Sequence, residues 1–125
     1  MIVGIGVDIV AIARLRRVLE RRTERFIERV YTPLEQEFCR AHHDPIPHYA
    51  ARFAAKEALF KALGTGWAQG VGWLEVEVQR RDREAPTLVL SGEAERRSQL
   101  LGTRICHISL SHSEESAVAF VILES

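Results

Sequence analysis

The chain has 125 residues, 46% of them hydrophobic and 27% charged, and its 17 basic and 17 acidic residues leave a formal net charge of zero. This length and composition predict one globular domain, residues 1–125, that can bury a core of its own. The balanced charge argues globally for neither a nucleic-acid nor a membrane partner.

The N-terminal residues and the cysteines bear on location. Residues 1–10, MIVGIGVDIV, lack a basic n-region, and Asp8 interrupts their apolar run, which is not typical of a signal peptide. No apolar run approaches the roughly 20 residues of a membrane span. Cys39 and Cys106 have no metal-ligand spacing and make no disulfide framework. We therefore expect a cytoplasmic protein with reduced thiols.

Residues 2–8, IVGIGVD, predict a buried strand in which β-branched residues alternate with glycines that permit close approach. Asp8 is a carboxylate at the end of this otherwise apolar run. It could cap the helix expected just after it, which is the interpretation that this stretch alone favours. The alternative is a metal ligand that faces Glu57.

Residues 11–30 predict a helix with seven arginines but only three glutamates. Four of the arginines recur at spacings of three and four and share one face: Arg14, Arg17, Arg21 and Arg25. A solvated face held by Glu–Arg pairs explains part of this pattern, but the excess positive charge predicts a docking surface for an acidic partner. A nucleic-acid partner is disfavoured because no aromatic residues interleave with the basic ones.

A short helix is expected from Thr32 to about His42, because Thr32 can act as N-cap and Glu35 completes a capping box. His42, His43 and His48 surround the loop at residues 44–47 and resemble a metal cluster in composition. We interpret them instead as part of a solvated loop, after which the main helix is expected to begin near His48.

The stretch from Arg52 to Gly66, RFAAKEALFKALGTG, predicts a helix of about three turns whose apolar and alanine-rich faces can both pack. Glu57 and Lys61 lie at the edge of the apolar arc and Lys56 lies inside it, although buried charge is costly unless it is paired or bound. The two lysines are the only ones among 17 basic residues, and a compact ammonium suits a crowded phosphate site. An ordinary i,i+4 pair of Glu57 with Lys61 is the structural alternative.

Two strands and a helix are expected next. Residues 74–79 alternate between apolar and polar, which predicts a strand with one buried face, and residues 87–90 predict its partner. Ser91 is expected to cap a helix that ends at Gly102. We interpret this helix as scaffold.

The last segment predicts a hairpin of strands 104–111 and 117–124. His107 and Ser109 share a polar face of the first strand, whereas the second strand contains AVAFVIL and is apolar on both faces. One chain of this size has difficulty covering both faces, so we expect an oligomer in which the last strand is interior.

Three separated motifs, GIGVDIV, RFAAKEALFKALGTG and HISLSHS, together resemble holo-acyl-carrier-protein synthase, the short bacterial type of 4′-phosphopantetheinyl transferase. The resemblance spans nearly the whole chain. It implies an α+β fold with a mostly antiparallel sheet against a long central helix, and a homotrimer with active sites between subunits. It also implies transfer of 4′-phosphopantetheine from coenzyme A to a serine of apo-acyl carrier protein, a small acidic protein, in fatty acid biosynthesis.

The resemblance further implies roles for individual residues. Asp8 and Glu57 would hold Mg²⁺, or alternatively Mn²⁺, and Lys61 would stabilise charge on the phosphates. The remaining coenzyme-binding candidates are Arg52 for the 3′-phosphate, Gly64, Gly66, His107 and Ser109. The proton acceptor stays open between Glu57 and a water activated by the metal. A non-catalytic adaptor that binds acidic helices through the basic helix is the rival reading, but it gives Asp8 and Glu57 no purpose.

Overall fold

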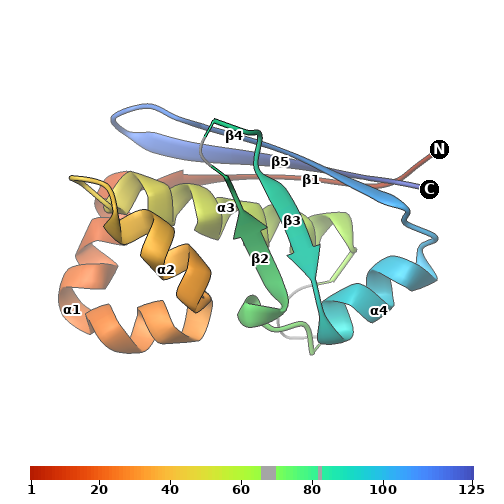
Figure 1. Ribbon diagram of the computed structural model, residues 1–125, viewed down its shortest axis with the longest axis horizontal. Coiled ribbons are helices and arrows are strands. Elements are labelled where there is room, and N and C mark those ends of the chain that lie inside the picture. Colours follow the sequence, from red (N-terminus) through yellow and green to blue (C-terminus); the bar gives the residue numbers. More distant parts are fainter. Residues whose placement is uncertain (66–69, 82) are drawn as a thin grey trace.

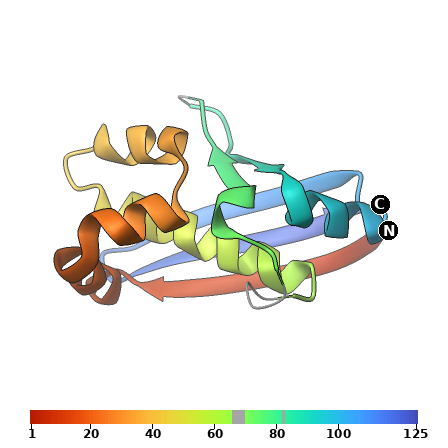
Figure 2. The same cartoon turned by 90° about the horizontal axis from the view of Figure 1, so that it is seen from below.

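The computed structural model describes residues 1–65, 70–81 and 83–125 (Figure 1). Its elements in chain order are β1 (Ile2–Ala11), α1 (Ile12–Val30), α2 (Pro33–Arg40), α3 (Ile46–Ala62), the 3-10 helix η2 (Trp73–Glu75), β2 (Val76–Gln79), β3 (Thr87–Leu90), α4 (Gly92–Leu100), β4 (Ile105–His112) and β5 (Ser116–Glu124). The three long strands form one layer, and the helices lie on one side of it (Figures 1 and 2).

The main sheet is antiparallel and has the strand order β1-β5-β4. The predicted C-terminal hairpin is confirmed, with both strands placed within a residue of expectation. A second, two-stranded antiparallel sheet pairs β2 with β3, and residues 74 and 75 of the first predicted strand belong to η2 instead. The expected α+β architecture, an antiparallel sheet packed against a long central helix, is confirmed.

Glycines in β1 allow α3 to lie directly on the sheet. A Cβ atom built on Gly6 would lie 1.9 Å from the carbonyl oxygen of Ala58, and one on Gly4 would lie 2.3 Å from that of Ala62. No side chain fits there, because the obstacle is helix backbone that cannot rotate away. The alanine-rich face of the central helix was therefore correctly expected to pack closely, and this contact fixes the distance between α3 and β1.

A buried ion pair ties three elements to α3. Lys56 Nζ lies 2.7 Å from Glu35 Oε1 and also donates to the carbonyl oxygens of Trp73 at 3.0 Å and Val76 at 2.6 Å. Both side chains are fully buried. Glu35 also accepts from backbone nitrogens of two further residues, Thr32 at 2.9 Å and Val78 at 3.0 Å.

This network satisfies the charges that burial would otherwise penalise. Burial lowers the pKa of Lys56, and the neighbouring Glu35 opposes that shift. The expected capping box of α2 is confirmed, and its glutamate therefore serves the core as well as the helix end.

α1 is not the uninterrupted helix that the sequence predicted. Arg22 has non-helical backbone angles, φ −139° and ψ 40°, and divides the helix into two parts. The buried positions Leu15 and Leu19 would be followed on the same face by residues 22 and 23, which are Arg and Thr. No apolar side chain therefore packs that turn against the core. The Thr23 hydroxyl also donates to the Leu19 carbonyl, a side-chain bond that bends helices.

Among the described residues, no helix is both long and apolar enough to cross a bilayer. The chain ends lie side by side, and the backbone nitrogen of Ser125 donates to the carbonyl of Met1 at 2.8 Å (Figure 1).

Candidate active site

Asp8 lies inside β1, opposite Ala119 of β5, and does not cap α1. The helix begins at Ile12 with Ala11 at the N-cap position, because β1 continues to pair with β5 for three residues beyond Asp8. The prediction of a helix cap at this position is therefore wrong. The Asp8 side chain is instead free to face α3.

Lys61 reaches from α3 to β1 and contacts this carboxylate. Its Nζ lies 3.1 Å from Asp8 Oδ1 and donates to the Val7 carbonyl at 3.0 Å. The Asp8 side chain is 19% exposed, whereas that of Lys61 is 55% exposed. Lys61 thus joins helix to strand, which differs from the within-helix pair with Glu57 that the spacing allowed.

Glu57 lies one helical turn before Lys61 and opens into the same pocket of about 720 Å³ as Asp8, Lys61 and Arg14. Burial is the main cause that raises the pKa of Glu57, and the charge of Asp8 raises it further, while Lys61 opposes them. Two carboxylates therefore repel each other across a partly buried pocket. This is the spatial relation that the metal-ligand alternative for Asp8 requires.

The pocket could accept a small divalent cation. No group of three or more histidine, cysteine or acidic side chains with metal-binding geometry occurs in the described part of the chain. Mg²⁺, however, is commonly held by one or two carboxylates together with water and substrate phosphates. A cation between Asp8 and Glu57 would relieve the repulsion that contributes to the raised pKa of Glu57, so the donor set fits.

Lys56 belongs to the core and not to this pocket. Its buried ammonium is fully engaged by Glu35 and two carbonyls, so only Lys61 of the two lysines can reach a phosphate. The argument from the rarity of lysine therefore does not extend to Lys56, whose side chain points about 100° around α3 from that of Glu57.

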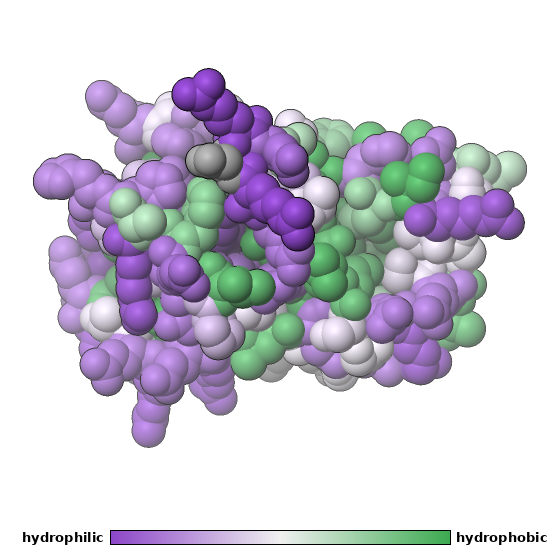
Figure 3. Space-filling view, in the orientation of Figure 1, coloured by the Kyte–Doolittle hydropathy of each residue, from purple (hydrophilic) through white to green (hydrophobic). Residues whose placement is uncertain are grey.

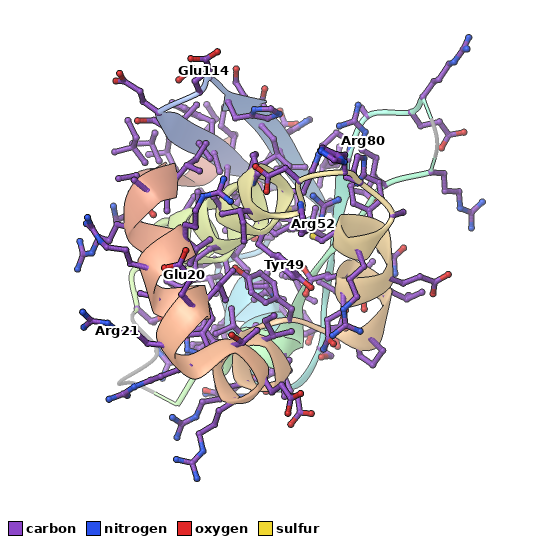
Figure 4. All side chains as sticks on the ribbon, turned by 90° about the vertical axis from the view of Figure 1, so that its left-hand side faces the viewer. Glu20, Arg21, Tyr49, Arg52, Arg80 and Glu114 are labelled. Carbon is purple, nitrogen blue, oxygen red and sulfur yellow. The ribbon has the colours of Figure 1, made fainter. Side chains whose placement is uncertain are left out.

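Arg52 lies beneath a second cluster of basic groups. It is 2% exposed, and its guanidinium stacks 4.0 Å from the centre of the Phe38 ring. Its Nη1 donates weakly to the His48 carbonyl at 3.4 Å, while Nε and Nη2 have no hydrogen-bond partner among the described residues. Figure 4 shows Arg52 pointing into the interior beside Tyr49, with Arg80 close to it.

The predicted solvated loop is confirmed for His43, which is exposed, but His42 and His48 are half-buried beside Arg52. α3 begins at Ile46, earlier than expected, and the Ile46 backbone nitrogen donates to Asp44 Oδ1 at 3.2 Å. His48 is therefore helical and half-buried, and its ring stacks on that of His42 with a centroid distance of 3.6 Å. His112, at the end of β4, completes the group at 5.8 Å from His48.

Sequence reasoning did not single out His112, although the alternation of β4 offers the signal. His112 continues the inward-facing positions Cys106, Ile108 and Leu110, which pack against the core. A histidine at the end of this inward-facing row is expected to contact the helix that covers the sheet, and His112 contacts His48 of α3.

The other predicted coenzyme-binding residues lie apart from the Asp8 pocket. His107 and Ser109 are exposed on the outer face of β4, where His107 Nε2 lies 3.0 Å from Glu124 Oε1. Gly64 follows α3 with a positive φ of 74° and open space beside it. Gly66 lies outside the described residues.

The basic residues of α1 are exposed, and hydrophilic side chains crowd the end of the molecule formed by α1 and α2 (Figure 3). Arg14 borders the Asp8 pocket, and Arg21 points away from the protein (Figure 4). Arg17, like Arg14 and Arg21, precedes the break at Arg22. Arg25 follows the break, so the four arginines do not share the single straight face that the spacing predicted.

The sequence and the fold are both similar to those of known proteins. The sequence model of the 4′-phosphopantetheinyl transferase superfamily matches residues 4–121. The holo-[acyl-carrier-protein] synthase of Koribacter versatilis is 47% identical over 124 residues, which cover 99% of each chain.

Solved structures agree with this similarity. The holo-[acyl-carrier-protein] synthase of Neisseria meningitidis matches with a TM-score of 0.88 and 32% identity, covering 100% of both chains. That of Bacillus anthracis, solved with CoA (3′,5′-ADP), matches with a TM-score of 0.82 and 41% identity, covering 100% of this chain and 98% of its own. The chain therefore belongs to the 4′-phosphopantetheinyl transferase superfamily and, within it, to the holo-[acyl-carrier-protein] synthases.

Proposed function

We propose that this protein transfers the 4′-phosphopantetheine group of coenzyme A to a serine hydroxyl of an apo-acyl carrier protein and releases adenosine 3′,5′-bisphosphate. The names of its relatives and the coenzyme found with the Bacillus anthracis protein support this activity. The observation that carries it within the chain is the pocket in which Asp8, Glu57 and Lys61 converge from β1 and α3.

Asp8 and Glu57 would hold Mg²⁺, as their shared pocket and mutual repulsion support. When bound, the ion would offset negative charge on the coenzyme pyrophosphate. Lys61, whose ammonium is held at β1 by Asp8 and the Val7 carbonyl, lies where it can donate to a phosphate oxygen that gains charge in the reaction.

Glu57 is also the candidate proton acceptor for the attacking serine. Its carboxylate opens into the pocket that also holds Asp8 and Lys61, so it lies where the attacking serine would meet the phosphate. One intervening water would let it accept the serine proton while it remains a metal ligand.

In the direct test, the protein is incubated with coenzyme A, Mg²⁺ and an apo-acyl carrier protein, and the mass of the carrier is measured by mass spectrometry. The carrier should gain one phosphopantetheine group, and adenosine 3′,5′-bisphosphate should appear in equal amount. A carrier that keeps its mass while it binds the protein would favour the adaptor reading instead.

A homotrimer with sites between subunits would bring the Asp8 pocket of one subunit close to coenzyme-binding candidates of another. In one chain, Arg52 lies on the far side of α3 from Glu57, and His107, Ser109 and Gly64 lie apart from the Asp8 pocket. The outer face of the sheet also exposes Ile5, Val7 and Ile9 of β1 and Phe120 of β5. Large apolar side chains on one uncovered face favour burial against other copies.

Sedimentation at micromolar concentration should therefore give the mass of a trimer. The Phe120→Asp variant should shift the population toward monomer, because a carboxylate would be buried in the contact without a partner. Leu34→Asp, which changes an exposed apolar residue on α2, is the matched control and should leave the mass unchanged. A monomeric wild-type protein would contradict the proposed assembly.

The basic surface of α1, comprising Arg14, Arg17, Arg21 and Arg25, is the proposed docking site for the acidic carrier protein. We expect Arg17→Glu combined with Arg21→Glu, neither of which lines the Asp8 pocket, to raise KM for the carrier on the order of tenfold at low salt, because two attractive contacts become repulsive. KM for coenzyme A should stay unchanged.

Arg96→Glu combined with Arg104→Glu serves as the matched control, since both arginines are exposed and lie outside α1. The two double variants carry the same net charge. If they raise KM for the carrier equally, the effect is one of overall charge and the docking role of α1 is wrong.

A further inference from the structure

The cluster around Arg52 holds more buried positive charge than the described residues neutralise. Burial lowers the pKa of Arg52, and Glu35 is the nearby carboxylate that opposes this shift. Glu35, however, already pairs with Lys56 at 2.7 Å and accepts two backbone bonds. The guanidinium of Arg52 therefore keeps two buried nitrogens without a hydrogen-bond partner among the described residues.

A buried cation with unsatisfied donors favours an anion beside it. Arg80 after β2 also acts on Arg52, as do the Cys39 and Tyr31 side chains together with Glu35. The groups that face the neighbouring His48 are all basic: His42 after α2, Arg52 on α3, His112 on β4 and Arg80. The acid in the adjoining loop, Asp44, is engaged by Arg16 at 2.7 Å. The result is a basic cluster over Arg52, in which His42 and His48 are half-buried and His112 and Arg80 are exposed.

The stacking of His42 on His48 disfavours protonation of His48 while no anion is bound. Two imidazolium rings at a centroid distance of 3.6 Å would repel each other, and Arg52, Arg80 and His112 add to that repulsion. Burial, followed by these neighbouring charges, lowers the pKa of His48 to about 4. A dianion bound beside these groups would favour the protonated form of a histidine that is neutral without it.

We propose that this histidine cluster makes coenzyme A binding proton-linked: the cluster takes up a proton as the 3′-phosphate of coenzyme A settles beside Arg52. The inference rests on the proposed function for the identity of the ligand and adds the pH dependence of its affinity. Because the bound state holds more protons than the free state, affinity rises as pH falls.

Calorimetry without carrier protein tests the linkage. Binding of coenzyme A and of dephospho-coenzyme A is measured near neutral pH in two buffers of different ionisation enthalpy. Coenzyme A should take up as much as about one proton more than the dephospho form. The Kd for coenzyme A should rise by up to about tenfold from roughly pH 6.5 to 7.5, whereas the Kd for dephospho-coenzyme A should change much less.

His48→Gln removes the titrating ring but keeps hydrogen-bonding capacity, and it should abolish the extra proton uptake. His43→Gln changes the exposed neighbouring histidine and should leave it intact. The ionisation of the phosphate itself is the same for all three proteins, so the difference between them isolates the cluster. Should His48→Gln fail to fold, the comparison of the two ligands on the wild-type protein decides alone.

Equal proton uptake for the two ligands, or an unchanged pH slope in His48→Gln, overturns the linkage. Failure of the proposed function looks different, because coenzyme A would then neither bind nor be consumed with a carrier protein at any pH. Normal transfer with a pH-independent Kd would remove this inference and leave the proposed activity in place.

Discussion

Asp8→Asn and Glu57→Gln should each lower kcat for phosphopantetheine transfer by at least about 100-fold, with little change in the unfolding midpoint. Each substitution keeps the size of the side chain and removes one of the two carboxylates that share the pocket with Lys61. Removal of one preorganised electrostatic group from an active site, such as an oxyanion-hole donor, costs about 10²–10³ in rate. Transfer is measured from the mass of the carrier, and folding from urea unfolding followed by circular dichroism.

Glu37→Gln is the matched control, since Glu37 is an exposed carboxylate on α2. It should leave kcat unchanged. Removal of divalent cations with a chelator should reproduce the loss in the wild-type protein, and added Mg²⁺ should restore it. A Glu57→Gln variant with wild-type kcat in Mg²⁺ would exclude this carboxylate both as metal ligand and as proton acceptor.

Lys56→Met should lower the free energy of unfolding by about 3–5 kcal/mol, because it leaves Glu35 as a buried carboxylate without its cation. It also removes the donor to the Trp73 and Val76 carbonyls. A loss of this size is a large fraction of the roughly 5–15 kcal/mol that stabilises a typical domain. Urea unfolding at fixed protein concentration measures it.

Arg16→Met is the control, since it breaks an ion pair with Asp44 whose two side chains are each 44% exposed. Exposed pairs contribute about 0–1 kcal/mol, so this variant should unfold near the wild-type midpoint. Equal losses in the two variants would show that the buried network adds nothing beyond an ordinary surface pair.

The two lysines illustrate where sequence reasoning stops. Their rarity and their place on one helix were visible in the sequence and pointed to a phosphate site, for which Lys61 was the candidate. The partner of Lys56, Glu35, is 21 residues away and was recognised only as a capping residue. A helical wheel gives the direction of each side chain, but not which element lies in that direction, and this element decides between core and site.

Asp8 illustrates the same limit at a strand end. Local pattern placed the end of β1 at Asp8 and favoured a helix cap, whereas pairing with β5 carries the strand to Ala11. Register with a partner more than 100 residues away is a tertiary property. His48 was likewise taken for part of a loop, whereas α3 begins at Ile46, whose backbone nitrogen donates to the Asp44 side chain.

The sequence by itself determined the fold class, the family, the central helix, the C-terminal hairpin and the choice of Asp8, Glu57 and Lys61 as one candidate site. These follow from residue periodicity and from motifs whose order along the chain is preserved. Only the tertiary structure decided that Lys61 bonds to β1, that Lys56 is locked into the core, and that three histidines gather over Arg52. Each of these depends on contacts between distant segments, whose burial sets the cost of every charge and which no local pattern encodes.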